Sequence, residues 1–456
     1  MPWSAPPTAY HQSIRRVLLA PARTVFLGFA SAAAVGTALL MLPVAHVEGE
    51  PSRLLAALFT AVSALCVTGL ATVDTGTHWT AFGQLVILVL IQIGGLGVMT
   101  FASVVGLAVV RRLSLQAKLT AAAETRSSGI DNIATLVRRV VSISLTVEAV
   151  VAAILTAQLA AWYRLPFLEA LWLGVFHAVS AFNNAGFSLY SDSMTGYAAD
   201  PVMTLSMSAA IIIGGLGFPV IMQLRAHIRT PRRWTMHTRI VLATTAVLLL
   251  TGTVFITAME WSNPRTLGEL DWPAKLLVGL FHSVQTRTAG FNSVDIGAMD
   301  PATWLGMDVL MFIGAGPAGT AGGIKVTTFA VLFFIILTEI RGVGAVNVFG
   351  KRLSRSVHRQ AISVALLAVA LVVVSTLAIM VMTDFDLDRV LFEVVSAFGT
   401  VGLSTGITAA LPAGAQLILV ALMFIGRLGP ITFAAALAFR AHHRAYQLPK
   451  ERPIIG

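Results

Sequence analysis

Four glycine-centred segments carry the residues whose chemistry is easiest to read from this sequence. In each segment a glycine follows two small, apolar or short polar residues. The four triplets are Val67, Thr68, Gly69; Asn184, Ala185, Gly186; Thr288, Ala289, Gly290; and Thr400, Val401, Gly402. None contains a carboxylate, so the available ligands are backbone carbonyls and the side-chain oxygens of threonine and asparagine. Because such oxygens can replace the hydration shell of a monovalent cation, the segments indicate a site for such an ion.

These glycines occupy one equivalent position in an internal repeat. The related segments are 57–76, 174–193, 279–298 and 389–408, and the glycines are 117, 104 and 112 residues apart. Glycine suits such a turn because it reaches positive φ, which lets successive carbonyls point in one direction. A repeat of about 110 residues that occurs four times predicts a pore with pseudo-four-fold symmetry.

A short apolar stretch precedes each glycine turn. The stretches are 54–66, 167–182, 273–286 and 389–399. Because about 20 residues are needed to cross a bilayer, we interpret them as re-entrant half-helices whose carboxyl ends, with their partial negative charge, face the turn. Non-helical backbone at that depth is tolerated where it lines a water-filled cavity. The pattern predicts a selectivity filter made of four pore loops.

The composition is that of an integral membrane protein. Apolar residues make up 56% of the chain and charged residues only 11%, against roughly 25% charged in soluble domains. The mean hydropathy is +0.82. Eight apolar spans are expected at 24–42, 81–110, 136–161, 203–224, 239–259, 303–340, 360–382 and 414–439. The fold class is therefore all-α: eight transmembrane helices and four half-helices, arranged as four helix–pore loop–helix repeats around one pore. The single cysteine, Cys66, excludes an intramolecular disulfide framework.

The net charge of +10 has a distribution that indicates a membrane topology and gives no sign of nucleic-acid binding. Of the 31 basic residues, 23 lie in the termini and in the loops 111–139, 225–239 and 341–359. The opposite segments carry six: Arg53, Arg164, Arg265, Lys275, Arg287 and Arg389. The positive-inside rule then places both termini in the cytoplasm. Of the 21 acidic residues, 16 fall on the outer side, where they would concentrate cations.

The second helix of each repeat carries its own glycine, namely Gly94, Gly214, Gly314 and Gly426. Close helix packing explains the first two, but the third copy cannot be a plain helix. It contains Gly314, Gly316, Pro317, Gly319, Thr320, Gly322 and Gly323 within ten residues. Glycine and proline are the poorest helix formers. The segment 314–323 is therefore expected to break its helix just below the filter, where it would act as a gate.

Two basic residues, Lys325 and Arg427, are expected at membrane depth and are therefore functional candidates. Arg427 stands where the other repeats have Gly95, Gly215 and Ala315. Two interpretations stay open for it: a fixed charge that raises the barrier to a cation, or a structural ion pair or carbonyl contact. Glu148 is also expected at this depth, as a partner in a helix-packing network.

At these residues the chain resembles the Trk/Ktr/HKT superfamily of potassium transporters. The resemblance rests on the four half-helix and glycine copies, on GAGPAGTAGGIK at 314–325 and on FIGRLGP around Arg427. It implies that backbone carbonyls hold potassium at Thr68, Gly69, Asn184, Gly186, Thr288, Gly290, Thr400 and Gly402. It also implies that the 314–323 loop, with Lys325 and Arg427, forms the gate. In related plant members a serine at the first filter glycine goes with sodium permeation, so the resemblance implies that Gly69 favours potassium over sodium.

Within the superfamily the chain is closest to the KtrB type of membrane subunit, because it begins about 23 residues before the first repeat helix. This implies a homodimer in the cell membrane that docks on a cytosolic ring of RCK-type subunits, which bind ATP or ADP. Potassium would be the transported ion, and no catalytic cofactor or enzyme activity is expected. A sodium-permeable or sodium-coupled transporter of the same fold is the alternative. An alternating-access carrier is disfavoured because the repeats share one orientation.

The expected organisation follows the repeat. It comprises a cytoplasmic segment 1–23, repeat one at 24–110, repeat two at 136–228, repeat three at 238–340, repeat four at 360–440 and a cytoplasmic tail 441–456.

Overall fold

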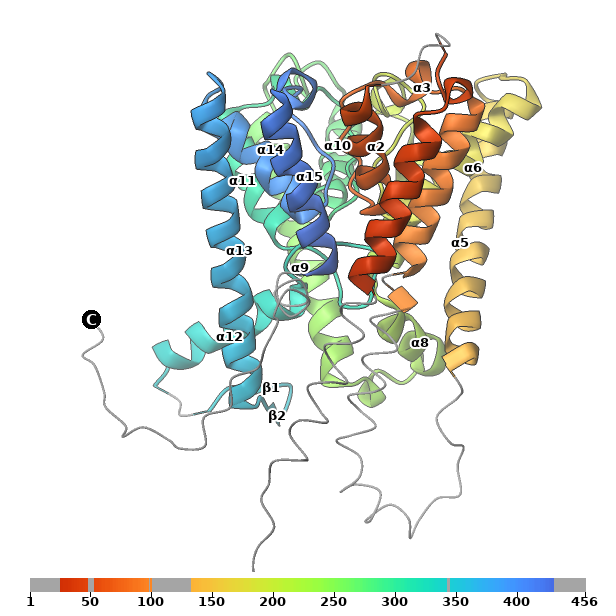
Figure 1. The fold of residues 1–456 in the computed structure, drawn as a ribbon. Helices are drawn as coiled ribbons and strands as arrows, with labels where there is room; N and C mark the ends of the chain where they lie inside the picture. Colours follow the sequence, from red (N-terminus) through yellow and green to blue (C-terminus); the bar gives the residue numbers. More distant parts are fainter. Residues whose placement is uncertain (1–24, 48–52, 98, 101–132, 343–344, 430–456) are drawn as a thin grey trace, which may run out of the picture.

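The computed structural model describes residues 25–47, 53–97, 99–100, 133–342 and 345–429 (Figure 1). The expected terminal segments 1–23 and 441–456 and most of the basic loop 111–139 lie outside the described residues, as do the ends of the expected spans 81–110 and 414–439. Within the described part the chain is helical, apart from a two-stranded hairpin of β1 (Asn347–Val348) and β2 (Lys351–Arg352).

Each repeat contributes a short helix that ends at its glycine turn. These helices are α2 (Leu54–Leu65), α6 (Phe167–Phe182), α10 (Trp272–Gln285) and α14 (Leu387–Gly399). Their bounds agree within two residues with the stretches predicted as half-helices. Their carboxyl-terminal halves are largely buried, and an equivalent phenylalanine of each is almost fully buried: Phe59, Phe176, Phe281 and Phe392. The half-helices therefore form the core on which the turns are mounted.

Other helices of the described chain surround this core. They are Val25–Leu40, Ala81–Gly97, α5 (Ile133–Ala161), α7 (Pro201–Leu216), α8 (Phe218–His227), α9 (Met236–Glu260), α11 (Pro301–Phe312), α12 (Val326–Ile340), α13 (Arg355–Met382) and α15 (Ala413–Leu428). A four-residue helix, α3 (Thr75–His78), follows the first turn. Half-helix α6 packs on α5 and α7, α10 on α9 and α7, and α14 on α11, α13 and α15. Helices α6, α10 and α14 thus each pack on a flanking helix of their own repeat, and α10 and α14 also touch the repeat before them.

Helices α7 and α11 begin at the end of the molecule that carries the amino termini of the half-helices. Each begins with an aspartate that caps its first turn. Asp200 caps α7 by accepting hydrogen bonds from the backbone of Val202 and Met203, at 2.8 and 3.1 Å. Asp300 caps α11 through Ala302 at 2.9 Å. In both helices a proline follows the cap at the first helical position, where its missing N–H leaves no hydrogen bond unmade.

The spanning helices differ from the expected set. Among the described residues, three helices are long and apolar enough to cross a membrane by length and composition: Val137–Ala161, Met236–Glu260 and Arg355–Met382. The prediction of one helix over 203–224 was wrong, because the chain bends by 101° between α7 and α8. Gly217, at the bend, has a φ of +90°. The expected span 303–340 is divided into α11 and α12, with the glycine-rich segment between them.

Candidate ion pathway

The four glycine turns share one unusual backbone conformation. The glycines have positive φ values of 90°, 70°, 78° and 97° at Gly69, Gly186, Gly290 and Gly402. Two residues earlier, non-glycine residues also have positive φ: Val67, Asn184, Thr288 and Thr400, at 50–69°. Such values are rare for residues with a Cβ, and above all for β-branched ones. Strain that recurs at the same position in all four copies indicates a geometry kept for function.

The four turns meet in a closed ring. A Cβ added to Gly69 would overlap Ala185 and Gly186, and one on Gly186 would lie 2.8 Å from the Ala289 carbonyl oxygen. In the same way Gly290 faces Val401 and Gly402, and Gly402 returns to Thr68 and Gly69. The order one, two, three, four, one places repeats one and three on opposite sides, and likewise repeats two and four. The structure therefore brings together all twelve residues predicted for the filter.

In the part of the chain that the structure describes, the carbonyl oxygens of these turns have no hydrogen-bond donor. Backbone N–H groups of the turns donate back to their own half-helices, as Thr68 does to Ser63 at 2.8 Å and Val401 to Ser396 at 2.8 Å. Among the described residues, no hydrogen bond reaches the carbonyls of the twelve turn residues. The buried hydroxyls of Thr68, Thr288 and Thr400 also have no partner. Because buried carbonyls are almost always paired, this ring of free oxygens is suited to a ligand with positive charge.

Hydroxyl groups brace three of the turns from behind. Ser63 accepts from the backbone of Gly69 at 3.1 Å and donates to the carbonyl of Leu70 at 2.7 Å. Ser180 donates to Phe187 at 2.8 Å, and Ser396 accepts from Gly402 at 3.1 Å.

In the third repeat Gln285 takes the place of the serine: its side-chain oxygen accepts a hydrogen bond from the backbone N–H of Phe291 at 3.0 Å. These bracing residues are not among the site residues predicted from the sequence. A serine six residues before the glycine in three copies was the signal for them.

The glycine-rich segment forms a loop whose two ends are joined by backbone hydrogen bonds; we call this junction the neck of the loop. Helix α11 ends at Phe312 and α12 begins at Val326. Between them, the backbone of Gly314 donates to Ile324 at 2.8 Å and that of Val326 donates to Ala315 at 3.1 Å. The expected break at 314–323 is therefore present, and it is anchored at both ends.

This loop crosses the ring at the carboxyl ends of the half-helices. The hydroxyl of Thr320 lies 2.8 Å from the side-chain amide of Asn184, in repeat two. Two residues later, Gly322 lies so close to Thr400, in repeat four, that a Cβ would overlap its hydroxyl. Three residues span at most about 7 Å. Since repeats two and four are opposite members of the ring, the loop lies across the axis.

Arg427 fastens the middle of the loop. One terminal nitrogen of its guanidinium donates to the Thr320 carbonyl, and the other donates to Gly94 in repeat one at 2.8 Å. Lys325 donates to the Ala321 carbonyl at 2.6 Å. Of the interpretations left open by the sequence, the structure shows the carbonyl contact, and Arg427 makes it with the loop itself. Arg427 is 3% exposed, so these bonds are shielded from water.

The loop also explains the bend between α7 and α8. Gly316 and Thr320 donate their backbone N–H groups to the carbonyls of Gly215 and Gly214, at 2.8 and 3.2 Å, and Phe218 donates to Ala318 at 3.1 Å. The loop thus provides hydrogen bonds that replace those of a continuous helix. These partners are about a hundred residues away in sequence, so the local sequence of repeat two gave no sign of the bend.

Arg287 was expected among the basic residues on the outer side, but it is buried beside the ring. It is 5% exposed, three residues before Gly290, and its guanidinium donates to the carbonyl of Gly314 at 3.4 Å. The other terminal nitrogen has no acceptor among the described residues. A cavity of about 10 Å³, with room for about one water, lies against Arg287, Asn184, Thr245 and Ala315. The other repeats have Cys66, Asn183 and Gly399 at this position, so an arginine there was the available signal.

Glu148 occupies a packing network, as predicted. Its carboxylate accepts hydrogen bonds from Gln92 at 3.1 and 3.2 Å and from Asn183 at 3.1 Å. The network ties α5 to the helix Ala81–Gly97 and to the end of α6.

Comparison with known proteins decides the family. Residues 22–445 match the TrkH family, described as cation transport proteins. The chain belongs to the TrkH family. This confirms the superfamily that was expected from the glycine turns and the glycine-rich loop.

Individual members of the TrkH family are similar over nearly the whole chain. The Ktr system potassium uptake protein B of Bacillus subtilis is 38% identical, over 93% of this chain and 94% of that protein. Its counterpart from Vibrio alginolyticus is 37% identical, over 95% and 94%. The potassium/sodium uptake protein NtpJ of Enterococcus hirae is 31% identical, over 97% and 98%. The solved structure of the potassium transporter TrkH from Vibrio parahaemolyticus matches with a TM-score of 0.72 over 91% of this chain and 84% of that one; at 19% identity, this likeness concerns the fold alone.

Proposed function

We propose that this chain is the pore-forming, ion-translocating subunit of a potassium uptake system of the Ktr/Trk type. The observation that carries the proposal is the closed ring of four turns with free carbonyl oxygens. The similar potassium uptake proteins from Bacillus subtilis and Vibrio alginolyticus support it independently.

In the proposed mechanism the ring replaces water around the ion. A hydrated cation enters from the end that carries the half-helix amino termini, where most acidic residues lie. At the ring the carbonyls of Thr68, Ala185, Ala289 and Val401 each adjoin the glycine of a neighbouring repeat. These oxygens and the partial negative charge of the four half-helix carboxyl ends offset the loss of hydration. No side-chain carboxylate lines the turns, which suits a monovalent cation.

The loop at 314–323 is proposed as the gate. It lies across the axis on the inner side of the ring, and Arg427 holds it there through the Thr320 carbonyl. Arg287 holds the neck of the same loop through Gly314. Passage of an ion then requires the loop to move away from Asn184 and Thr400. Because both arginines are buried, their positive charges are little screened by water and also oppose the approach of a cation while the loop is in place.

The regulation that we propose is cytosolic. A ring of RCK-type subunits that binds ATP or ADP would dock on the basic loops and bias the gate, and two copies of this chain would form a homodimer with one pore each. Both termini would face the cytoplasm. The names of the similar Ktr system proteins imply a system with more than one component.

A sodium-permeable or sodium-coupled transporter is the second candidate. One observation favours keeping it: the similar protein of Enterococcus hirae is a potassium/sodium uptake protein. The glycine at position 69 supports potassium.

Growth of a bacterium that lacks its own potassium uptake tests the proposal. Expression of this chain should restore growth at low potassium, and co-expression of an RCK-type subunit should strengthen the rescue. The matched measurement is rubidium uptake into proteoliposomes with sodium or potassium as the competitor. Competition by potassium alone is expected. Equal competition by sodium would favour the second candidate, and a folded protein that moves neither ion would refute both.

A further inference from the structure

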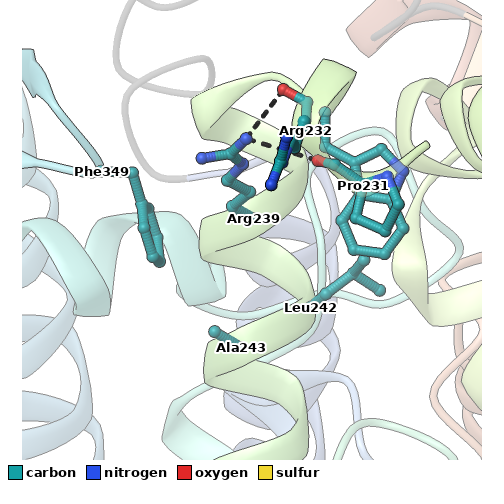
Figure 2. A pocket seen from close by; sticks show the side chains of 7 residues that line it. Pro231, Arg232, Arg239, Leu242, Ala243 and Phe349 are labelled. Carbon is teal, nitrogen blue, oxygen red and sulfur yellow. Dashed lines mark hydrogen bonds between the residues drawn. The ribbon is translucent and has the colours of Figure 1, made fainter.

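A basic and aromatic groove lies away from the ion pathway, at the end of the molecule that carries the basic loops. It has a volume of about 550 Å³ and lies between the start of α9, the 3-10 turn before it (Pro231–Arg233) and the β1–β2 hairpin (Figure 2). The lining residues are Pro231, Arg232, Trp234, Arg239, Leu242, Ala243 and Phe349. None of the seven is acidic.

The groove lies at the level expected for lipid headgroups. Helix α9 has 25 residues and is therefore about 37 Å long, whereas a bilayer has a hydrocarbon core of about 30 Å. The excess is little more than one helical turn, and the basic residues at the amino end of α9 assign it to the headgroup region on that side. Trp234, half-buried just before α9, donates its indole N–H to the carbonyl of His227 at 3.0 Å, which fixes the ring there. Tryptophan is enriched at this level of membrane proteins.

An apolar stripe on α9 continues the groove toward the bilayer centre. Ala243 is exposed, and Val247, Leu250 and Val254 follow it at helical spacing with 57%, 67% and 69% of their surfaces exposed. Arg239 lies one turn before Ala243 on the same face. One face of α9 therefore carries the positive charge of Arg239, then the groove, and then an apolar surface suited to a hydrocarbon chain.

The two arginines of the groove are available to an anion. Arg239 uses one terminal nitrogen for the carbonyls of Pro231 and Arg232, at 3.3 and 3.0 Å. These bonds hold the guanidinium in place, and its other terminal nitrogen points away from both carbonyls (Figure 2). Arg232 is exposed beside it. A guanidinium with free N–H groups matches the geometry of a phosphate.

We propose that this groove binds the phosphate headgroup of an anionic phospholipid, with an acyl chain along Val247, Leu250 and Val254. Positive charge, an aromatic rim and an apolar path that leads out of the groove are together the features of a lipid site, since a soluble phosphate would use only the first. The proposal does not depend on the filter or the gate.

Native mass spectrometry of the purified protein tests the site, with phosphatidylglycerol and phosphatidylcholine as the two probes. Arg239→Gln and Arg232→Gln should each weaken binding of the first phosphatidylglycerol about fivefold, the effect of one basic residue near an anionic surface. Arg233→Gln is the matched control, because Arg233 is exposed and adjacent but does not line the groove. It should leave binding unchanged, and phosphatidylcholine should bind all variants equally. Arg239→Lys, which keeps the charge, should retain most of the affinity and so exclude misfolding.

Several results would overturn the proposal. An equal loss with Arg233→Gln would show that only diffuse charge attracts the lipid. Full retention in both groove variants would show that the lipid binds elsewhere. Displacement of phosphatidylglycerol by millimolar inorganic phosphate would assign the groove to free phosphate. Loss of binding to a cytosolic subunit in the groove variants, with lipid binding unchanged, would assign it to a protein partner.

Discussion

The second helices of the four repeats use an equivalent glycine in two different ways. In repeats one, two and four it lets the helix approach the end of its own half-helix. A Cβ on Gly94, Gly214 or Gly426 would overlap the carbonyl oxygen of Leu65, Phe182 or Phe398 respectively. In repeat three the helix has already ended at Phe312, and Gly314 faces Gly322 of its own loop.

If the loop is the gate that we propose, the difference gives one repeat the moving part while the other three keep the ring in place. Three tight helix contacts fix the half-helices. The fourth place is filled by a loop held through a few hydrogen bonds, and by Arg287 where the other repeats have smaller, uncharged residues. Few buried apolar contacts are typical of segments that open at low cost, and five of the ten residues of 314–323 are glycines without a side chain.

The largest effect on ion flux is expected from a variant that releases the loop. Arg427→Gln should raise rubidium flux into proteoliposomes without the regulatory subunit by about ten- to hundredfold. The reason is that a hydrogen bond from a charged group contributes about 1.5–3 kcal/mol, and about 1.4 kcal/mol corresponds to a factor of ten.

Deletion of 316–322 is the reference for this variant. The deletion should itself raise flux and loosen its dependence on the regulator. When Arg427→Gln is added to it, no further rise is expected, because the bond to Thr320 is already gone. If a well-folded deletion protein carried no flux, the gate assignment would be wrong.

A smaller effect is expected at the ring itself. Gly290→Ser should reduce the preference for potassium over sodium about tenfold, since a serine at a φ of +78° is strained by about 1–3 kcal/mol and its Cβ overlaps the Val401 carbonyl. The measurement is competition between the two ions in the rubidium assay. Gly406→Ser is the matched control, because Gly406 has a φ of +93° but nothing within 4 Å of an added Cβ. Unchanged selectivity at position 290, or an equal loss at position 406, would contradict the filter role.

The smallest effect is expected at the neck of the loop. Arg287→Gln should raise flux about threefold, because its bond to Gly314 is long and only one neck contact is lost. Arg265→Gln provides the control, since it removes the same charge from an exposed position outside the ring. A change of equal size in both variants would show that Arg287 acts through overall charge rather than through the loop.

Much of this arrangement follows from the sequence because the repeat supplies four independent copies of each signal. The half-helices and the glycine positions are found in this way, and the loop is found because glycine and proline oppose a helix. Features that depend on distant partners are not. The bend at Gly217 depends on Gly316 and Thr320 of another repeat, and the local sequence 211–223 looks like an uninterrupted apolar helix. Arg287 is likewise counted as an outer charge, because its burial arises only when α10 meets the loop.

The ring at the centre of the molecule is made by one polypeptide rather than by four identical ones. A substitution in a homotetrameric pore alters every quadrant at once, whereas here each quadrant can diverge alone. Thr68 and Val401 already differ in side chain from Ala185 and Ala289, while all four backbones adjoin neighbouring glycines in the same way. Evolution can therefore adjust ion preference in single, unequal steps, and Gly69, Gly186, Gly290 and Gly402 need not be equally sensitive to replacement.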